Sequence, residues 1–162
     1  MTSRVRCAIL LAAMSAALLC GNAVAADNQA KDPFLGTWMM DSDKSTFVPG
    51  PVPEDRTMTF ELKDGALHHI TSTRNLFLGG TDDINYTAKF DGKDYPITGT
   101  GLDTISLKRI DPNTIERAGK VRGKVTETGT MKVSPDGKVL TITIKGSYNG
   151  TNYSSMQVLT RQ

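Results

Sequence analysis

Two arginines, Arg109 and Arg117, share the parity of the apolar residues in alternating runs of the chain. In a β-strand, residues of one parity lie on one face of the sheet, so both guanidinium groups are expected to point into the interior. A buried guanidinium needs an acceptor, which a ligand carboxylate could supply through two hydrogen bonds. Glu127, in phase with Met131, offers an internal partner instead, and a register shift of one residue would place all three outside. The internal ion pair is the simpler interpretation, and the ligand-binding alternative stays open.

The chain contains two histidines, His68 and His69, which are adjacent and therefore face opposite sides of a strand. They cannot bind one metal together. The histidine in phase with Ile70 is expected to face inward, where a single imidazole is either a satisfied core residue or an axial ligand of haem. Asp82-Asp83 lacks the spaced oxygen ligands of a calcium loop, and the chain has no Gly-X-Ser-X-Gly motif. We therefore predict no catalytic residues, no metal site and no cofactor.

The elements that position these residues are set by a regular succession of turns. Glycine turns follow one another along the chain, at Asp64-Gly65, Asp91-Gly92, Arg122-Gly123, Asp136-Gly137 and Asn149-Gly150, and Asp111-Pro112-Asn113 adds another turn. Short alternating runs separated by such turns are typical of antiparallel hairpins. A long meander has to bury one face and protect its edges, and closure does both. The sequence therefore predicts an all-β, up-and-down antiparallel barrel of nine or ten strands.

Ten strands are expected, at 34–40, 56–63, 66–74, 84–91, 93–99, 103–110, 114–121, 124–134, 138–146 and 151–161. The segment 48–53 is rich in proline and is expected to form a loop, and 75–83 is expected to be a longer connection over a cavity. The apolar parity of the strands predicts a cavity lined by Met58, Phe60, Tyr86, Phe90, Met131, Ile142 and Ile144, with Arg109, Arg117 and Glu127 as its polar residues.

Residues 1–25 have the composition of a secretory signal peptide. Arg4 and Arg6 precede an apolar run, and Ala23-Val24-Ala25 is a typical cleavage site. The apolar run is too short for a permanent membrane span, so no integral membrane segment is expected after cleavage. A lipoprotein modified at Cys20 is the alternative, which the large Leu19 before it disfavours. We expect a periplasmic or secreted protein with a flexible tail at 26–33 and one barrel domain at 34–162.

Charge and cysteine content narrow the classes of partner. The chain has 19 basic and 17 acidic residues, and the signal peptide holds two of the basic ones, so the remainder carries no net charge. Dispersed, balanced charge disfavours binding to nucleic acid. Both cysteines lie in the signal peptide, so the mature chain has no disulfide and depends on its core.

Gly36-Thr37-Trp38 at the start of the first strand resembles the Gly-X-Trp signature of the calycin superfamily, which includes lipocalins and fatty-acid-binding proteins. The resemblance implies that Trp38 closes one end of the barrel and that Arg161, on the last strand, packs across it as a structural seal with Gly36. The stretches 91–99 and 103–111 are similar to those of small secreted lipocalin-like bacterial proteins. Two features depart from the fatty-acid-binding proteins. A proline-rich loop replaces their two helices, and Gln157-Val158-Leu159 stands where they have Arg-X-Tyr.

Three functions follow from this interpretation. The first is an exported binding protein that holds a small apolar or amphipathic molecule in the barrel. The second is a structural or interaction barrel of the cell envelope whose interior is filled by side chains. The third is a barrel enzyme of the isomerase or cyclase type. Cavity volume separates the first two, because ligand pockets usually measure about 300 Å³ or more. The sequence favours a binding protein over an enzyme.

Overall fold

The computed structural model describes residues 32–75 and 80–162 and contains strands with one short 3₁₀ helix. The predicted signal peptide and Cys20 lie outside the described residues. In chain order the elements are β1 Gly36–Met40, η1 Ser42–Lys44, β2 Thr46–Val48, β3 Asp55–Lys63, β4 Ala66–Asn75, β5 Gly80–Ala88, β6 Asp91–Thr98, β7 Thr104–Asp111, β8 Thr114–Val121, β9 Lys124–Val133, β10 Val139–Tyr148 and β11 Thr151–Arg161.

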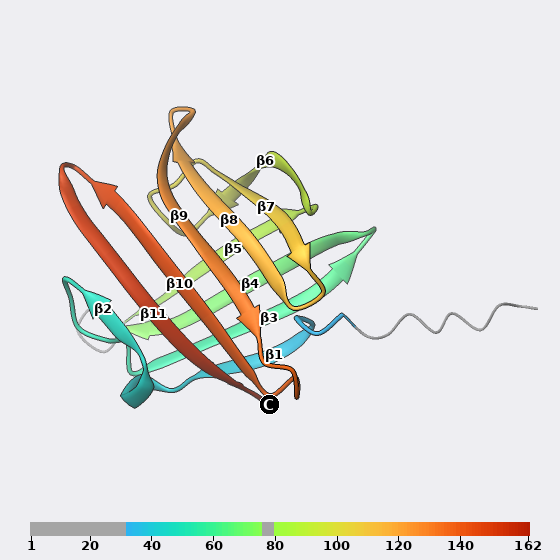
Figure 1. The fold of residues 1–162 in the computed structure, drawn as a ribbon. Coiled ribbons are helices and arrows are strands. Elements are labelled where there is room, and N and C mark those ends of the chain that lie inside the picture. Colours follow the sequence, from blue (N-terminus) through green and yellow to red (C-terminus); the bar gives the residue numbers. More distant parts are fainter. Residues whose placement is uncertain (1–31, 76–79) are drawn as a thin grey trace, which may run out of the picture.

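Ten of these strands form a closed antiparallel barrel, which confirms the predicted fold class. Consecutive strands from β3 to β11 are neighbours, and β1 closes the barrel by pairing with both β3 and β11. In the closing register, Trp38 lies opposite Arg161 and Met40 opposite Leu159. Figure 1 shows β1 crossing beneath the later strands and meeting the C-terminal end of β11. Closure leaves the barrel itself without a free edge.

Tight hairpins account for the sharp strand boundaries. Three of the predicted turns, Asp64-Gly65, Arg122-Gly123 and Asn149-Gly150, have positive φ at both central residues. This is the backbone of a two-residue hairpin turn whose twist matches that of the flanking strands. Elsewhere a glycine is needed for space. A Cβ at Gly99, where φ is +77°, would lie 1.8 Å from the carbonyl oxygen of Asp83, so the β6 end packs directly against the β5 backbone.

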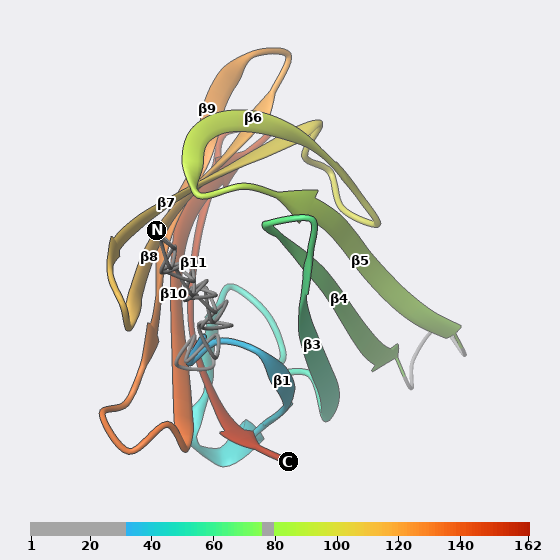
Figure 2. The same cartoon turned by 90° about the vertical axis from the view of Figure 1, so that its right-hand side faces the viewer.

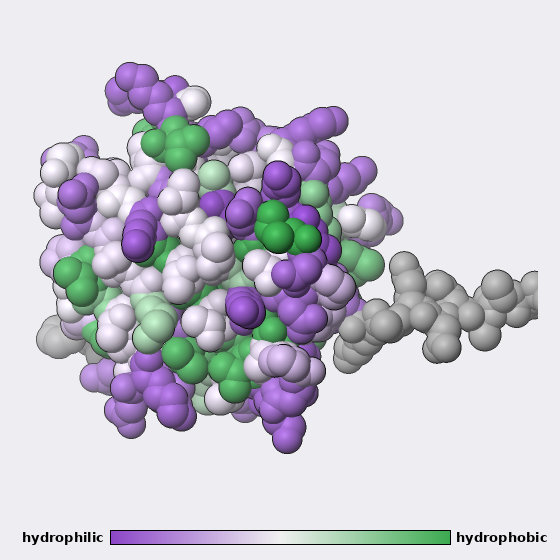
Figure 3. Space-filling model, in the orientation of Figure 1, coloured by the Kyte–Doolittle hydropathy of each residue, from purple (hydrophilic) through white to green (hydrophobic). Residues whose placement is uncertain are grey.

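The inward parity of the strands forms the core, as the alternation predicts. The fully buried side chains include Trp38, Leu67, Ile105, Ile115 and Leu140. Figure 2 shows β3, β4 and β5 on one side of the barrel and β7 to β11 on the other, with β6 passing across one end. The face of the molecule drawn in Figure 3 is largely hydrophilic, with hydrophobic side chains scattered among polar ones.

Three sequence-based boundaries need correction. The structure adds β2, which pairs only with β11 and so extends the sheet outside the barrel. The expected connection 75–83 is shorter, since β4 reaches Asn75 and β5 begins at Gly80; residues 76–79 lie outside the described part. The described end of the predicted flexible tail is anchored, because Asp32 forms an ion pair with Arg109 and the Pro33 carbonyl accepts a hydrogen bond from Arg161.

Candidate functional site

A cavity of about 90 Å³ lies inside the barrel, and Trp38 is not among its lining residues. Its wall combines apolar and polar side chains from β3, β4, β5, β6, β8, β9, β10 and β11, together with the β6–β7 loop. The lining residues are Arg56, Met58, His69, Thr71, Ile84, Tyr86, Ile97, Thr100, Leu102, Arg117, Glu127, Met131, Ile142, Ile144 and Gln157.

Arg117 and Glu127 form an ion pair in the cavity wall. The Arg117 Nη2 atom lies 2.5 Å from Glu127 Oε1, and both side chains are largely buried. Tyr153 donates from its hydroxyl to Glu127 Oε2 over 2.8 Å. Gly146 makes room for this contact, because a Cβ there would lie 2.4 Å from the Tyr153 ring. The internal partner of Arg117 is therefore Glu127, one of the two alternatives that the sequence left open.

His69 lies at the centre of an aromatic stack. Its ring centroid is 4.5 Å from that of Phe60 and 4.6 Å from that of Tyr86. Its Nε2 atom is 2.6 Å from the hydroxyl oxygen of Thr71, and its Nδ1 atom is buried with no partner among the described residues. Burial lowers the pKa of His69 to about 3, with the positive charge of Arg117 as the second cause. The imidazole is therefore neutral at physiological pH.

A second polar group joins β3, β4 and β11 at the same cavity. Arg56 donates to the Thr73 hydroxyl over 3.0 Å and to Gln157 Oε1 over 2.9 Å. Gln157 is 3 % exposed and in turn donates to the Ser155 hydroxyl. The buried Gln157 amide and the half-buried Arg56 guanidinium hold neighbouring parts of the wall in place through this hydrogen bond.

Trp38 and Arg161 pack together where the first and last strands of the barrel meet. The guanidinium carbon of Arg161 lies 4.1 Å from the centroid of the Trp38 ring. Arg161 also donates to the carbonyl oxygens of Leu35, Pro33 and Gly137, and the indole donates to the Phe34 carbonyl. A Cβ at Gly36 would lie 2.9 Å from Arg161 Nη1, so glycine gives this side chain its space. These contacts join residues 33–38 to the last strand, β11.

The structure separates the predicted site residues into two groups. Seven line the cavity: Met58, Tyr86, Arg117, Glu127, Met131, Ile142 and Ile144. Phe60 is not among the lining residues, but its ring packs against the ring of His69. Phe90 and Arg109 are also absent from the cavity wall. They contact each other instead: the guanidinium carbon of Arg109 lies 4.0 Å from the centre of the Phe90 ring, and Arg109 forms an ion pair with Asp32 at 2.5 Å. Shared parity predicted the face of each residue but not its height along the barrel axis.

Several lining residues were missed by the sequence analysis. The expectation that the histidine in phase with Ile70 faces inward was wrong, because His69 is buried with Thr71 and Thr73 while Ile70 is 37 % exposed. Arg56 and Gln157 share parity with buried neighbours, so the same alternation could have identified them. Leu102 lies in a loop, where no alternation exists to place it. It packs against Gly119, whose Cβ would lie 2.5 Å from Leu102 Cδ1.

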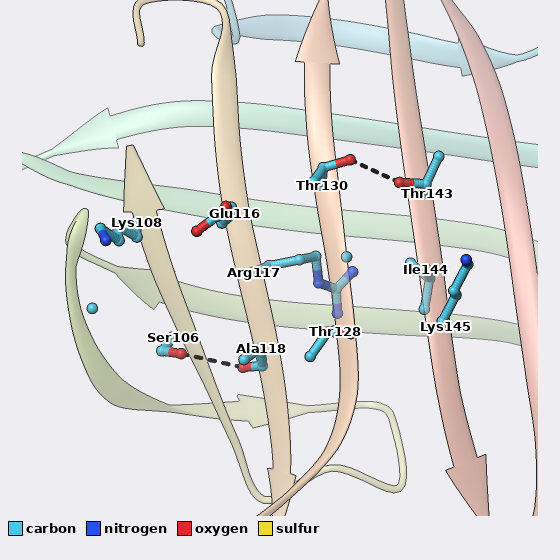
Figure 4. Close-up of a pocket in the computed structure, with 12 residues that line it drawn as sticks. Ser106, Lys108, Glu116, Arg117, Ala118, Thr128, Thr130, Thr143, Ile144 and Lys145 are labelled. Carbon is cyan, nitrogen blue, oxygen red and sulfur yellow. Dashed lines mark hydrogen bonds between the residues drawn. The ribbon is translucent and has the colours of Figure 1, made fainter. Parts of the chain in front are cut away.

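The outer surface of the barrel also has a depression. A depression of about 480 Å³ on the outer face of β7 to β10 is lined by polar side chains, among them Lys108, Glu116, Thr130 and Lys145 (Figure 4). In the same view Arg117 extends from β8 toward β9.

Within residues 32–75 and 80–162, no three potential metal-ligating side chains gather, and no helix is long and apolar enough to cross a membrane. The internal cavity is far too small for haem.

Comparison with solved structures places the barrel among known folds. The zebrafish ileal bile acid-binding protein, solved with cholic acid, aligns with a TM-score of 0.51 and 9% identity over 80% of this chain and 99% of that one. As-p18, an extracellular fatty-acid-binding protein, aligns with a TM-score of 0.50 and 14% identity over 81% and 97%. No protein-family model and no curated protein matches the sequence. At these identities the likeness concerns the fold alone, and that fold is calycin-like.

Proposed function

We propose that this protein is an exported carrier that binds a small amphipathic molecule inside its barrel. The observation that carries the proposal is the internal cavity, where an aliphatic wall faces converging polar groups. Met58, Ile142 and Ile144 supply apolar surface, and His69 and Arg117 supply hydrogen-bonding groups. Pockets of this mixed character, with few polar groups on an apolar wall, are typical of small-molecule sites.

The volume of the cavity limits the size of the ligand. About 90 Å³ corresponds to about three water molecules at ~30 Å³ each, or to a compound of about four or five non-hydrogen atoms. Very small ligands gain at most about 1.5 kcal/mol per non-hydrogen atom, which gives a dissociation constant no tighter than about 3 to 40 μM. A larger ligand would require Leu102 and its loop to move outward.

Native mass spectrometry of the protein purified from its own host tests binding, because a retained ligand appears as a defined added mass. A cavity-filling variant, Ile144→Phe, should lose that mass. Thr143→Phe is the matched control, because Thr143 is the adjacent residue on β10 and lines the outer depression, as Ile144 also does, but not the cavity. Loss in both variants, or no added mass in the unmodified protein together with no binding of small amphipathic probes, would contradict the proposal.

A filled structural or interaction barrel is the second candidate. The cavity is well below the ~300 Å³ of usual ligand pockets, and the Arg117 guanidinium already has an internal carboxylate partner. This candidate predicts that no small amphipathic probe binds and that Ile144→Phe changes only stability.

Export is a separate part of the proposal and rests on the composition of residues 1–25. The intact mass of the protein recovered from its host tests it. A chain that begins at Ala26 supports cleavage, whereas a chain that retains residues 1–25 contradicts it.

A further inference from the structure

The hydrogen bonding of His69 fixes which of its nitrogens carries the proton. A neutral imidazole has one donor and one acceptor nitrogen. If Nε2 donated to Thr71, the Thr71 hydroxyl proton would have no acceptor among the described residues, and Nδ1 would be an unpaired acceptor. If Thr71 donates to Nε2 instead, the only unpaired group is Nδ1–H. Because unpaired buried polar groups are costly, the second arrangement is preferred. His69 therefore presents a hydrogen-bond donor.

Arg117, another residue of the cavity wall, carries a second donor without a partner among the described residues. Its Nη2 atom is bound to Glu127, while its Nε–H is buried and has no partner among the described residues. Arg117 and His69 both line the cavity, and the charge of Arg117 acts on the His69 ring. The Glu127 carboxylate matches the guanidinium charge, so the pair as a whole is neutral.

Tyr86 supplies a third donor. Its ring stacks on His69, and it also lines the cavity. Burial raises the pKa of the Tyr86 hydroxyl to about 12, so the hydroxyl keeps its proton at physiological pH. Three residues that carry donor groups, from β4, β5 and β8, thus line one small cavity.

We propose that the cavity recognises a neutral carbonyl oxygen of a small ligand, which accepts hydrogen bonds from His69 Nδ1–H and Arg117 Nε–H, with the Tyr86 hydroxyl as a third donor. A carbonyl oxygen has the two lone pairs that two such donors require. A carboxylate would add a second negative charge beside Glu127, so a ketone, aldehyde or amide is favoured over an acid. This inference rests on the proposed function and names the chemical class of its ligand.

The test compares two compounds of the same shape, butan-2-one and 2-methylbut-1-ene, in which a CH₂ group replaces the carbonyl oxygen. Their binding to the full mature chain is measured by saturation-transfer NMR, with butyrate as a third probe. We expect butan-2-one to bind at least about tenfold more tightly than the alkene and more tightly than butyrate. Tighter binding of butyrate would overturn the preference for a neutral ligand.

Two variants assign this preference to the donors. Tyr86→Phe removes only a hydroxyl, and His69→Phe combined with Thr71→Val removes the imidazole together with its partner. Each is expected to reduce the ratio of ketone to alkene affinity about five- to tenfold, whereas Thr143→Val on the outer surface should leave it unchanged. An unchanged ratio in both cavity variants, each folded by its NMR spectrum, would overturn the assignment.

The outcomes distinguish the two proposals. If both compounds bind with equal affinity, the carbonyl inference fails and the binding barrel stands. If neither compound nor any other small probe binds, the proposed function itself fails. The His69 tautomer gives an independent readout, because long-range ¹H–¹⁵N spectra should show Nδ1 protonated. A proton on Nε2 in the unliganded protein would contradict the donor role.

Discussion

His69 should make the protein lose stability as the solution is acidified, before most carboxylates titrate. Its pKa in the folded state is about 3, because burial and the charges of Arg117, His68 and Arg56 disfavour the imidazolium. In the unfolded chain the pKa is about 6.5. The unfolded state therefore binds a proton that the folded state excludes, so the contribution of His69 is fully present above pH ~6.5 and is lost as the pH falls toward 3.

The size of the effect follows from the two pKa values. Between the two pKa values the free energy of unfolding falls by up to about 1.4 kcal/mol for each pH unit. Integrating this slope from pH 7 to pH 5 gives a decrease of about 2 kcal/mol. This is a sizeable share of the 5–15 kcal/mol that stabilises a typical domain. Urea unfolding followed by Trp38 fluorescence measures it. The variant His69→Phe with Thr71→Val should lack this 2 kcal/mol decrease, whereas His68→Gln, which keeps His69, should retain it.

Two results would refute this reasoning. One is an equal change in unfolding free energy between pH 7 and pH 5 for the unmodified protein and the double variant. The other is an NMR titration of folded protein in which the His69 ring takes up a proton near pH 6.5. Either would mean that the folded barrel admits the charged imidazole, and that the stack with Phe60 and Tyr86 is open to water.

Three further substitutions test the fold, each by urea unfolding. Arg161→Ala should cost about 2 kcal/mol through its lost carbonyl contacts and ring contact, and an unchanged midpoint would show that the seal contributes nothing. Arg117→Met should cost about 3 kcal/mol because Glu127 loses its ion-pair partner, and adding Glu127→Gln should restore part of the loss; no restoration would contradict the pairing. Gly99→Ala should cost well over 2 kcal/mol because its Cβ meets a carbonyl oxygen, while Gly92→Ala, with similar φ and open space, should cost only about 1–2 kcal/mol; equal costs would refute the close approach.

The strand pattern was predictable because its signals are local. A hairpin turn and a two-residue period are visible within about ten residues, so the expected strands agree closely with β3, β4 and β7 to β11. β2 was missed because three residues beside a proline-rich loop show no period. Its pairing with β11 is a property of the tertiary fold.

The candidate site was predictable only in part, since its geometry is not local. Parity placed Arg117 and Glu127 inside, and their 2.5 Å contact follows from a register between β8 and β9 that places Arg117 opposite Gly129 and Glu127 opposite Gly119. Parity could not show that Arg109 lies near Phe90, outside the cavity. Height along the barrel depends on strand tilt and stagger, which a single strand does not encode.

The closing pair of strands has a consequence for how the chain folds. β1 lies between β3 and β11, so its second edge stays unpaired until the last strand arrives. Contacts between distant parts of a chain are slow to form, because the entropy of the intervening loop must be overcome first. Every other pairing in the barrel joins two strands that follow one another in the barrel along the chain. During synthesis the open form therefore exposes the outer edges of β1 and the most recent strand. Joining Trp38 to Arg161 is the step that ends the risk of edge-to-edge aggregation.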